Sequence, residues 1–213
     1  MNADQNSSIC VHPRSSTVSL IVIAGGSGSG KSRLARLLHE ALPASAVLTL
    51  DHFYRDLSHL TPGQRERVNF DDPATIDWAS VETALFKLSS GHPAEIPRYD
   101  FHTHTRAAAT ETLQPTDFLI LEGLWPLTRP AIRDMAALTI FVDCPAGLRL
   151  SRRIARDTTE RGRTEASVRR QCAEHVEPMH ARHVQPQIDL AGRVLTSPIS
   201  DADVQQLLQA ATA

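Results

Sequence analysis

A short glycine-rich segment contains the first residues with an evident chemical use. The eight residues GGSGSGKS, 25–32, fit the pattern G-x-x-x-x-G-K-[ST]. Glycines let successive backbone N–H groups turn inward around phosphate oxygens, and a following helix adds partial positive charge at its N-terminus. In such a loop the lysine reaches the terminal phosphates and the last hydroxyl ligates Mg²⁺. The segment predicts a nucleoside triphosphate site formed by Gly25, Gly26, Ser27, Gly28, Ser29, Gly30, Lys31 and Ser32.

The elements around this phosphate loop are those that the motif requires. A β-branched apolar run, 18–26, predicts a buried strand before it, and apolar residues at helical spacing in 32–42 predict a helix after it. This context argues against the alternative hypothesis, an ordinary glycine-rich turn. Further strands are predicted at 46–51, 117–123, 138–144 and 191–197, and further helices at 78–91, 145–179 and 201–213. Strands that alternate with helices imply a doubly wound parallel α/β sheet.

Three classes of protein use such a loop, and the sequence favours one of them. A GTPase switch usually contains an Asn-Lys-x-Asp element, but none of the three asparagines (Asn2, Asn6 and Asn69) precedes a lysine. A motor ATPase is usually larger or part of a multidomain chain. A small-molecule kinase needs a carboxylate base, an acceptor pocket and mobile cations, and the sequence offers candidates for each.

Acidic residues end three of the predicted strands. Asp51 follows the second strand, at the edge where open α/β sheets place their ligands, and is the best candidate for the base. The alternative for Asp51 is a role in capping the next helix. Glu122 and Asp143 end two later strands, and either could hold Mg²⁺ through water. Periodicity alone does not choose between them.

An arginine-rich segment supplies the cations. Its helix has arginines at i, i+4 and i+7, which fall on one face: Arg149, Arg153 and Arg156. Arg161 and Arg163 flank Gly162 on a predicted mobile turn. Arginines on a closing lid could stabilise charge on a transferred phosphoryl group and exclude water. The alternative is a solvated basic helix paired internally with Asp157 and Glu160.

Beyond the loop, a series of longer motifs resembles one family. The segments AGGSGSGKS, LDHFYRD, NFDDPATIDW, IPRYDFHTHTR, LILEGLWPL, IRDMAALTIFVD, RLSRRIARDTTERGR and EPMH occur in this order. Together they closely resemble the uridine (uridine–cytidine) kinases, over about residues 18 to 188. DHFY, NFDDP and YDF-x-TH-x-R are far more specific than the loop alone. Phosphoribulokinases and pantothenate kinases share the loop but fit these acceptor segments less well.

This resemblance implies a fold, a reaction and a set of partners. The fold is an α/β P-loop kinase domain with a five-stranded parallel core, flanking helices and a helical Arg-rich lid. The reaction is transfer of the γ-phosphate of ATP or GTP to the 5′-hydroxyl of uridine or cytidine, giving UMP or CMP in pyrimidine salvage, with Mg²⁺. The family often forms tetramers. We expect one kinase domain at 18–213 behind a flexible N-terminus at 1–17.

The resemblance also implies roles for individual residues. Asp51 is the base, Asp71 and Arg153 hold the ribose hydroxyls, and Ser32 and Glu122 are associated with Mg²⁺, which favours Glu122 over Asp143. The remaining nucleoside-binding positions are Tyr54, Phe70, Tyr99, Phe101, His104, Arg163 and Gln171, and those that contact phosphates are Arg156 and Arg161. Within the first set, Tyr99 and His104 hydrogen-bond the pyrimidine edge, and Phe101 lies against its face.

Three further expectations concern residues near these motifs. Trp125 stands where the family has a smaller segment, and we expect it in the core. His102 and His104 alternate, which predicts a shared face on an extended chain. They could begin a metal site, but zinc sites usually show tighter spacing or a Cys pair, and Cys10, Cys144 and Cys172 are scattered. His102 is left without a role.

Composition limits the remaining possibilities. The 213 residues suit one domain, and a net charge of -2 does not favour nucleic acid or membrane as a partner. No apolar run is long enough for a signal peptide or a bilayer span, so a cytoplasmic protein is expected. Two alternatives to a uridine or cytidine kinase stay open: a kinase for another small hydroxylated substrate, and a nucleotide-binding regulator without catalysis.

Overall fold

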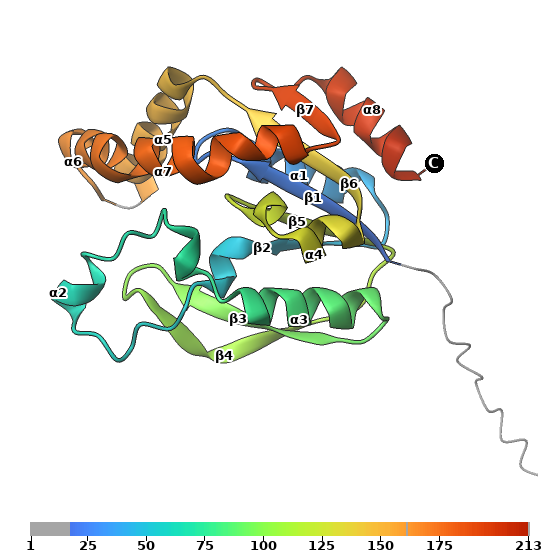
Figure 1. The fold of residues 1–213 in the computed structure, drawn as a ribbon, viewed down its shortest axis with the longest axis horizontal. Coiled ribbons are helices and arrows are strands. Elements are labelled where there is room, and N and C mark those ends of the chain that lie inside the picture. The colour runs from blue at the N-terminus through green and yellow to red at the C-terminus, as the bar shows by residue number, and fades with distance from the viewer. Residues whose placement is uncertain (1–17, 161, 213) are drawn as a thin grey trace, which may run out of the picture.

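A five-stranded parallel sheet forms the centre of the fold (Figure 1). The computed structural model describes residues 18–160 and 162–212, so the predictions for 1–17, Cys10 and Arg161 lie outside the described residues. The strand order is β2-β5-β1-β6-β7. The strands are β1 (Ser19–Gly25), β2 (Ser45–Thr49), β5 (Phe118–Gly123), β6 (Ala136–Asp143) and β7 (Arg193–Thr196). The predicted parallel α/β sheet is confirmed.

The helices predicted at 32–42, 78–91 and 201–213 are present, but the helix predicted at 145–179 is divided into shorter ones, and further short helices and turns occur. The α-helices are α1 (Lys31–Ala41), α2 (Pro62–Arg65), α3 (Trp78–Ser89), α4 (Pro130–Met135), α5 (Ala146–Glu160), α6 (Glu165–Gln171), α7 (Glu177–Met179) and α8 (Asp201–Thr212). The 3₁₀ turns are Leu50–Phe53, Pro73–Thr75, Pro126–Thr128 and Gln185–Leu190, and the π-helical turns are Cys172–Val176 and His180–Val184. None of the helices in the described part of the chain is both long and apolar enough to cross a membrane.

Each face of the sheet is covered by a different set of helices. Ile21 and Ile23 of β1 pack with α1 and α8 on one face. Leu20 and Val22 point the other way and pack with α3 and neighbouring segments. Successive side chains of a strand alternate between faces, and a parallel sheet buries both, so β1 reads as a continuous apolar run.

The register of the strands brings three chain segments to one edge. Glu122 of β5 pairs with Thr49 of β2 on one side and with Ile23 of β1 on the other. The phosphate loop follows β1, and the turn that contains Asp51 follows β2. Because all three strands run in the same direction, these segments leave the sheet side by side at its carboxyl edge. In Figure 1, α6 and α2 lie beyond this edge, at the left.

A β-hairpin that the sequence did not predict stands apart from the main sheet. It consists of β3 (Ala94–Asp100) and β4 (Thr105–Leu113), paired antiparallel, with a register shift between Pro97 and Tyr99. Pro97 interrupts the pattern of β3, and the middle of β4 is exposed on both faces, so neither strand shows a clear alternation. The predicted shared face of His102 and His104 is wrong, because both lie in the turn that reverses the chain and His104 has φ 54°.

Arg106 attaches this hairpin to the segment after β2. Its Nε donates to the backbone oxygen of Tyr54 at 2.9 Å, and its Nη2 lies 3.1 Å from a carboxylate oxygen of Asp77. Its backbone N–H donates to the Asp56 carboxylate at 3.1 Å. Arg106 therefore supplies several of the polar contacts that hold the hairpin near the carboxyl edge of the sheet.

We expect Arg106→Ala to lower the free energy of unfolding by about 2 kcal/mol, because a charged donor and its partners lose their hydrogen bonds. Urea denaturation measures this change. The matched control is Arg98→Ala in the same hairpin. Arg98 pairs with Glu111 at 3.0 Å, but both side chains are more than half exposed, so the cost should be under about 1 kcal/mol. Equal costs for the two variants would contradict the attachment role of Arg106.

Candidate functional site

The phosphate loop has a backbone that only glycine accommodates at one central position. Gly28 has φ 79°, and a Cβ there would lie 2.6 Å from the backbone oxygen of Arg149. The loop closes with a hydrogen bond of 3.0 Å from Ser29 N–H to the Gly26 oxygen, and α1 begins directly afterwards at Lys31. The loop therefore places its N–H groups and the helix N-terminus around one point, as an anion site requires.

A buried polar cluster supports the loop from behind. A Cβ on Gly26 would meet the His180 ring at 2.8 Å. Arg149 lies 2.9 Å from Nε2 of His180 and donates to Glu177 at 2.6 Å and to the Cys144 backbone oxygen at 3.0 Å. Burial, and secondly the charge of Arg149, lower the pKa of His180. Arg149 thus packs behind the loop, although its spacing grouped it with the other arginines of α5.

Another arginine that the sequence did not single out also binds the loop. Arg152 donates to the backbone oxygens of Gly28 and Ser29 at 3.2 and 3.3 Å, and to the Ser197 hydroxyl at 2.8 Å. Arg153 follows it directly and Arg149 lies three residues before it, so no local pattern separates Arg152 from the other arginines of α5. The contact depends on the long-range packing of α5 against the loop.

Glu122 lies in the centre of the site with a carboxylate that is largely buried. Burial raises the pKa of Glu122, the nearby charge of Lys31 opposes this rise, and the charge of Asp51 adds to it. Its Oε2 is buried and has no hydrogen-bond partner among the described residues. A carboxylate oxygen of this kind, together with the Ser32 hydroxyl, whose influence lowers the pKa of Glu122, fits the oxygen donors that Mg²⁺ prefers. The charge of Asp143, by contrast, acts on His180 behind the loop.

The His, Cys, Asp and Glu side chains of the described residues offer few further places for a metal ion. Within residues 18–160 and 162–212, no group of three or more of them could hold a metal ion. His102 is exposed on the hairpin turn, where its backbone N–H donates to Asp100 at 2.8 Å.

Asp51 lies between the phosphate loop and the segment that contains Asp71. It follows Thr49, whose hydroxyl accepts the Asp51 N–H at 3.3 Å and caps the 3₁₀ turn Leu50–Phe53. Thr49, and not Asp51, is therefore the capping residue here. The negative charge of Asp51 raises the pKa of Glu122 on one side and of Asp71 and Tyr54 on the other. Its carboxylate is thus close to both halves of the candidate site.

An aromatic cluster joins the hairpin to this region. Tyr54 packs against Phe70 and Tyr99 with ring centroids 5.4 and 5.2 Å apart, Phe70 stacks on His104 at 4.5 Å, and Tyr99 contacts Phe101 at 5.3 Å. The Tyr99 hydroxyl is buried and has no hydrogen-bond partner among the described residues. Burial raises the pKa of Tyr99 to about 12. The five predicted aromatic positions are therefore brought together, with an available polar atom among them.

Asp71 and Arg153 are also brought together, from opposite sides of the site. Burial raises the pKa of Asp71, and the charge of Arg153 is the main opposing influence. Arg153 comes from α5 and donates to the Ser27 hydroxyl of the phosphate loop at 3.1 Å. The charge of Arg153 therefore acts on Asp71 from α5, and the same side chain also contacts the loop.

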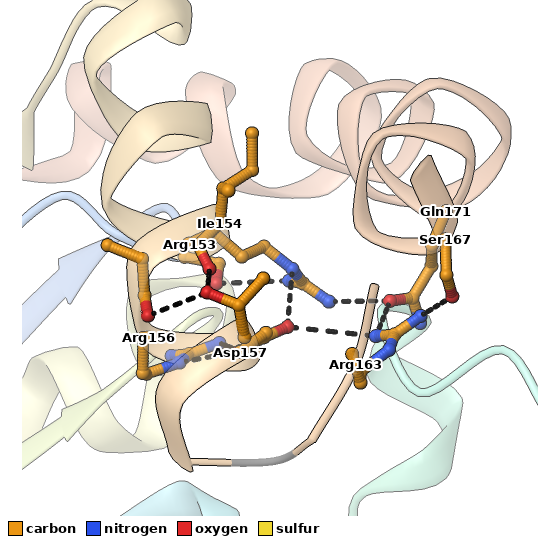
Figure 2. Close-up of polar contacts among 10 residues, drawn as sticks. Arg153, Ile154, Arg156, Asp157, Arg163, Ser167 and Gln171 are labelled. Atoms are coloured by element: carbon orange, nitrogen blue, oxygen red, sulfur yellow. Dashed lines mark hydrogen bonds and ion pairs between the residues drawn. The ribbon is translucent and has the colours of Figure 1, made fainter. Parts of the chain in front are cut away.

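The remaining predicted arginines surround one acidic residue (Figure 2). Arg156 and Arg163 pair with Asp157, as does Arg153, and Gln171 accepts from both Arg153 and Arg163. The sequence had offered Asp157 only as an internal partner of a solvated helix. Trp125 lies in the core with 1% exposure, as expected.

Comparisons with known proteins support this geometry. The sequence profile described as "Phosphoribulokinase / Uridine kinase family" matches residues 20–204. The chain belongs to this family. The family resemblance expected from the motifs is confirmed, and as a member the chain is a kinase.

Individual relatives agree with the family assignment. A uridine kinase of Alkaliphilus metalliredigens is 45% identical over 168 residues, which cover 78% of this chain and 81% of that protein. A uridine kinase of Deinococcus deserti is 42% identical over 169 residues, covering 78% and 82%. The solved phosphoribulokinase from Rhodobacter spheroides has a TM-score of 0.63 at 14% identity, covering 88% of this chain and 74% of that one. This structural likeness confirms the P-loop kinase fold.

The lowered pKa of His180 predicts a pH-dependent contribution to stability. The ordinary pKa of histidine is about 6.5, and below it His180 is protonated in the unfolded chain but still neutral in the native protein. Because the unfolded state then binds more protons, the free energy of unfolding falls as pH falls. We expect His180→Gln to flatten this slope between about pH 5 and about pH 7. Denaturant titrations across that range measure it.

The matched control for this prediction is His92→Gln, which removes an exposed histidine far from the loop. It should keep the slope of the unmodified protein. If His180→Gln kept that slope as well, the buried and neutral state of His180 would be refuted.

Proposed function

We propose that this kinase transfers the γ-phosphate of ATP or GTP to the 5′-hydroxyl of uridine and cytidine, giving UMP and CMP. The observation that carries the proposal is the position of Asp51, whose charge acts on Glu122 beside the phosphate loop and on Asp71 beside the aromatic cluster. A carboxylate between a triphosphate site and an acceptor site can serve as the base for a hydroxyl nucleophile. The uridine kinases among the relatives support the choice of acceptor.

In this proposal the donor is held by the phosphate loop. Its N–H groups and Lys31 bind the β- and γ-phosphates, and Ser32 and Glu122 hold Mg²⁺. When bound, Mg²⁺ supplies charge that neutralises the phosphate oxygens. Arg156, with Arg161 outside the described residues, contributes positive charge near the transferred group.

The acceptor is held by the opposite wall. Asp71 and Arg153 bind the two ribose hydroxyls, because a carboxylate accepts and a guanidinium donates. Tyr99 and His104 hydrogen-bond the pyrimidine edge, and the buried Tyr99 hydroxyl is available for such a bond. The aromatic faces of Tyr54, Phe70 and Phe101 enclose the base, while Arg163 and Gln171 complete its contacts. Asp51 then accepts the proton of the 5′-hydroxyl as its oxygen attacks the γ-phosphorus, and the bond from the γ-phosphorus to the β–γ bridging oxygen breaks, so that ADP or GDP leaves.

Several expectations from the sequence lie outside this proposal and stay predictions. They are the single domain at 18–213, the homo-oligomer, the cytoplasmic location and the place in pyrimidine salvage.

The two alternatives, a kinase for another hydroxylated substrate and a regulator without catalysis, are separated by one assay. ATP, Mg²⁺ and a panel of nucleosides and small polyols are incubated with the protein. Transfer only to a polyol would support the first alternative, and no transfer at all the second.

Replacing the proposed base tests the mechanism. Asp51→Asn should lower kcat for uridine by about 1000-fold, since the hydroxyl loses its proton acceptor, while ATP binding is kept. Steady-state kinetics and equilibrium titration with an ATP analogue measure the two effects. Asp134→Asn, an exposed change on α4, is the control and should leave both unchanged. Full activity of Asp51→Asn would remove this residue from the mechanism.

Replacing Asp71, and separately its neighbour Asp72, tests the contact with the ribose. Asp71→Asn should raise KM for uridine by about 10-fold or more, because a charged hydrogen bond to the ribose is weakened. The effect on 2′-deoxyuridine should be smaller, since that substrate lacks one of the hydroxyls. Asp72→Asn is the matched control: Asp72 caps the next turn by accepting from Ala74 N–H at 2.8 Å, and asparagine caps equally well. Equal effects on both nucleosides would argue against the ribose contact.

A further inference from the structure

Asp157 is a fully buried carboxylate at the end of α5, and arginines from two segments converge on it. Its side chain is 0% exposed. Oδ1 accepts from Arg156 at 2.8 Å, and Oδ2 lies 3.5 Å from Arg153 Nε and 3.6 Å from Arg163 Nη1. We call Arg153, Arg156 and Arg163 the arginine cluster. Figure 2 shows their guanidinium groups directed toward the Asp157 carboxylate.

The cluster extends to other elements of the site. Gln171 of α6 accepts from Arg153 at 3.0 Å and also from Arg163, whose other amino group donates to Ser167 at 3.0 Å. Arg153 additionally donates to Ser27 of the phosphate loop at 3.1 Å. The Asp157 backbone oxygen accepts from Arg163 N–H at 3.1 Å, which fixes the turn after α5. A continuous set of polar contacts therefore runs from the phosphate loop to α6.

The packing of the helices keeps this set in place. Val168, Cys172 and Val176 form a small apolar core with Leu150 and Ile154 of α5. This apolar core packs α6 and the following turn, Cys172–Val176, against α5. The polar contacts of Asp157 lie on the same helix pair, so the arginine cluster rests on a stable support.

Charge repulsion explains why a carboxylate is needed at this point. Guanidinium groups are always protonated, and bringing several of them together at low dielectric is unfavourable without a nearby anion. Removing the anion from such a buried arrangement leaves uncompensated charge. The cluster also faces the acceptor side, because the charges of Arg153 and Arg156 both lower the pKa of Asp71.

We infer that Asp157 is a positioning residue that holds the arginine cluster in one arrangement and thereby couples the donor site to the acceptor site. The inference rests on the proposed function, in which Arg153 and Arg163 contact the nucleoside and Arg156 contacts phosphate. Because one carboxylate orients all three, a ligand that fixes one arginine also restricts the others. Binding of the nucleoside should then strengthen binding of the nucleotide, and the reverse.

The test compares Asp157→Asn with Glu160→Gln. Asparagine has the size of aspartate but no charge, and Glu160 is an exposed acid three residues further along α5, outside the binding machinery. Asp157→Asn should fold, because Arg156 and Arg163 are partly exposed, at 35% and 29%, and can turn toward water. The measurements are kcat and KM for uridine, and titration of a non-hydrolysable ATP analogue with Mg²⁺, with and without uridine.

The expected results separate positioning from a merely structural role. In the unmodified protein and in Glu160→Gln, uridine should tighten analogue binding by roughly 10-fold. In Asp157→Asn this factor should fall to about 1, and kcat/KM should fall about 100-fold, as for other misplaced catalytic groups. Asp157→Asn combined with Arg163→Gln should be no worse than Asp157→Asn alone, since Asp157 acts through the cluster. Additive losses, or unchanged coupling in Asp157→Asn, would overturn the inference.

Two further results have a defined meaning: an Asp157→Asn variant that does not fold, and an unmodified protein that is inactive toward uridine. If Asp157→Asn does not fold, Asp157→Ser is measured with added formate. Recovery of the coupling by this small anion supports the inference, and folded protein with full coupling in its absence refutes it. An unmodified protein that neither phosphorylates uridine nor shows any effect of uridine on analogue binding refutes the proposed function instead. The inference alone fails if the unmodified protein phosphorylates uridine and Asp157→Asn does so equally well.

Discussion

The parallel register of β1, β2 and β5 is the constraint on which the rest of the molecule depends. It places Glu122 between the strand that leads into the phosphate loop and the strand that leads to Asp51. Parallel strands pair only through crossover connections, so the helices and the hairpin between them are long enough to reach over the carboxyl edge. The candidate site is therefore located where the chain leaves the sheet.

The same geometry brings several carboxylates together in a region that is partly shielded from solvent. The charge of Asp51 acts on both Asp71 and Glu122, and burial raises the pKa of these two carboxyl groups. Lys31 and Arg153 oppose these rises from the loop and from α5. Acids and cations thus come from different segments of the chain and meet only in the folded state, which ties the electrostatics of the site directly to correct folding.

The sequence predicted the elements with strong local patterns and missed those set by long-range packing. The loop, the buried strands and the acids at their ends followed from motif and periodicity, and the core position of Trp125 was correct. The hairpin was missed because β4 is mostly exposed and Pro97 interrupts β3. Arg149 and Arg152 share their sequence context with the other arginines of α5, so only the packed structure shows that Arg149 packs behind the loop and that Arg152 donates to its backbone oxygens.

The separation of the hairpin from the main sheet limits what substitutions in it can change. Its strands hydrogen-bond to each other and not to the five-stranded sheet, and Arg106 is a principal polar link to the segment after β2. Changes in the hairpin therefore leave the register of the central strands untouched. Substitutions in the hairpin can thus change the surroundings of Tyr99 and His104, while the phosphate loop that follows β1 keeps its geometry.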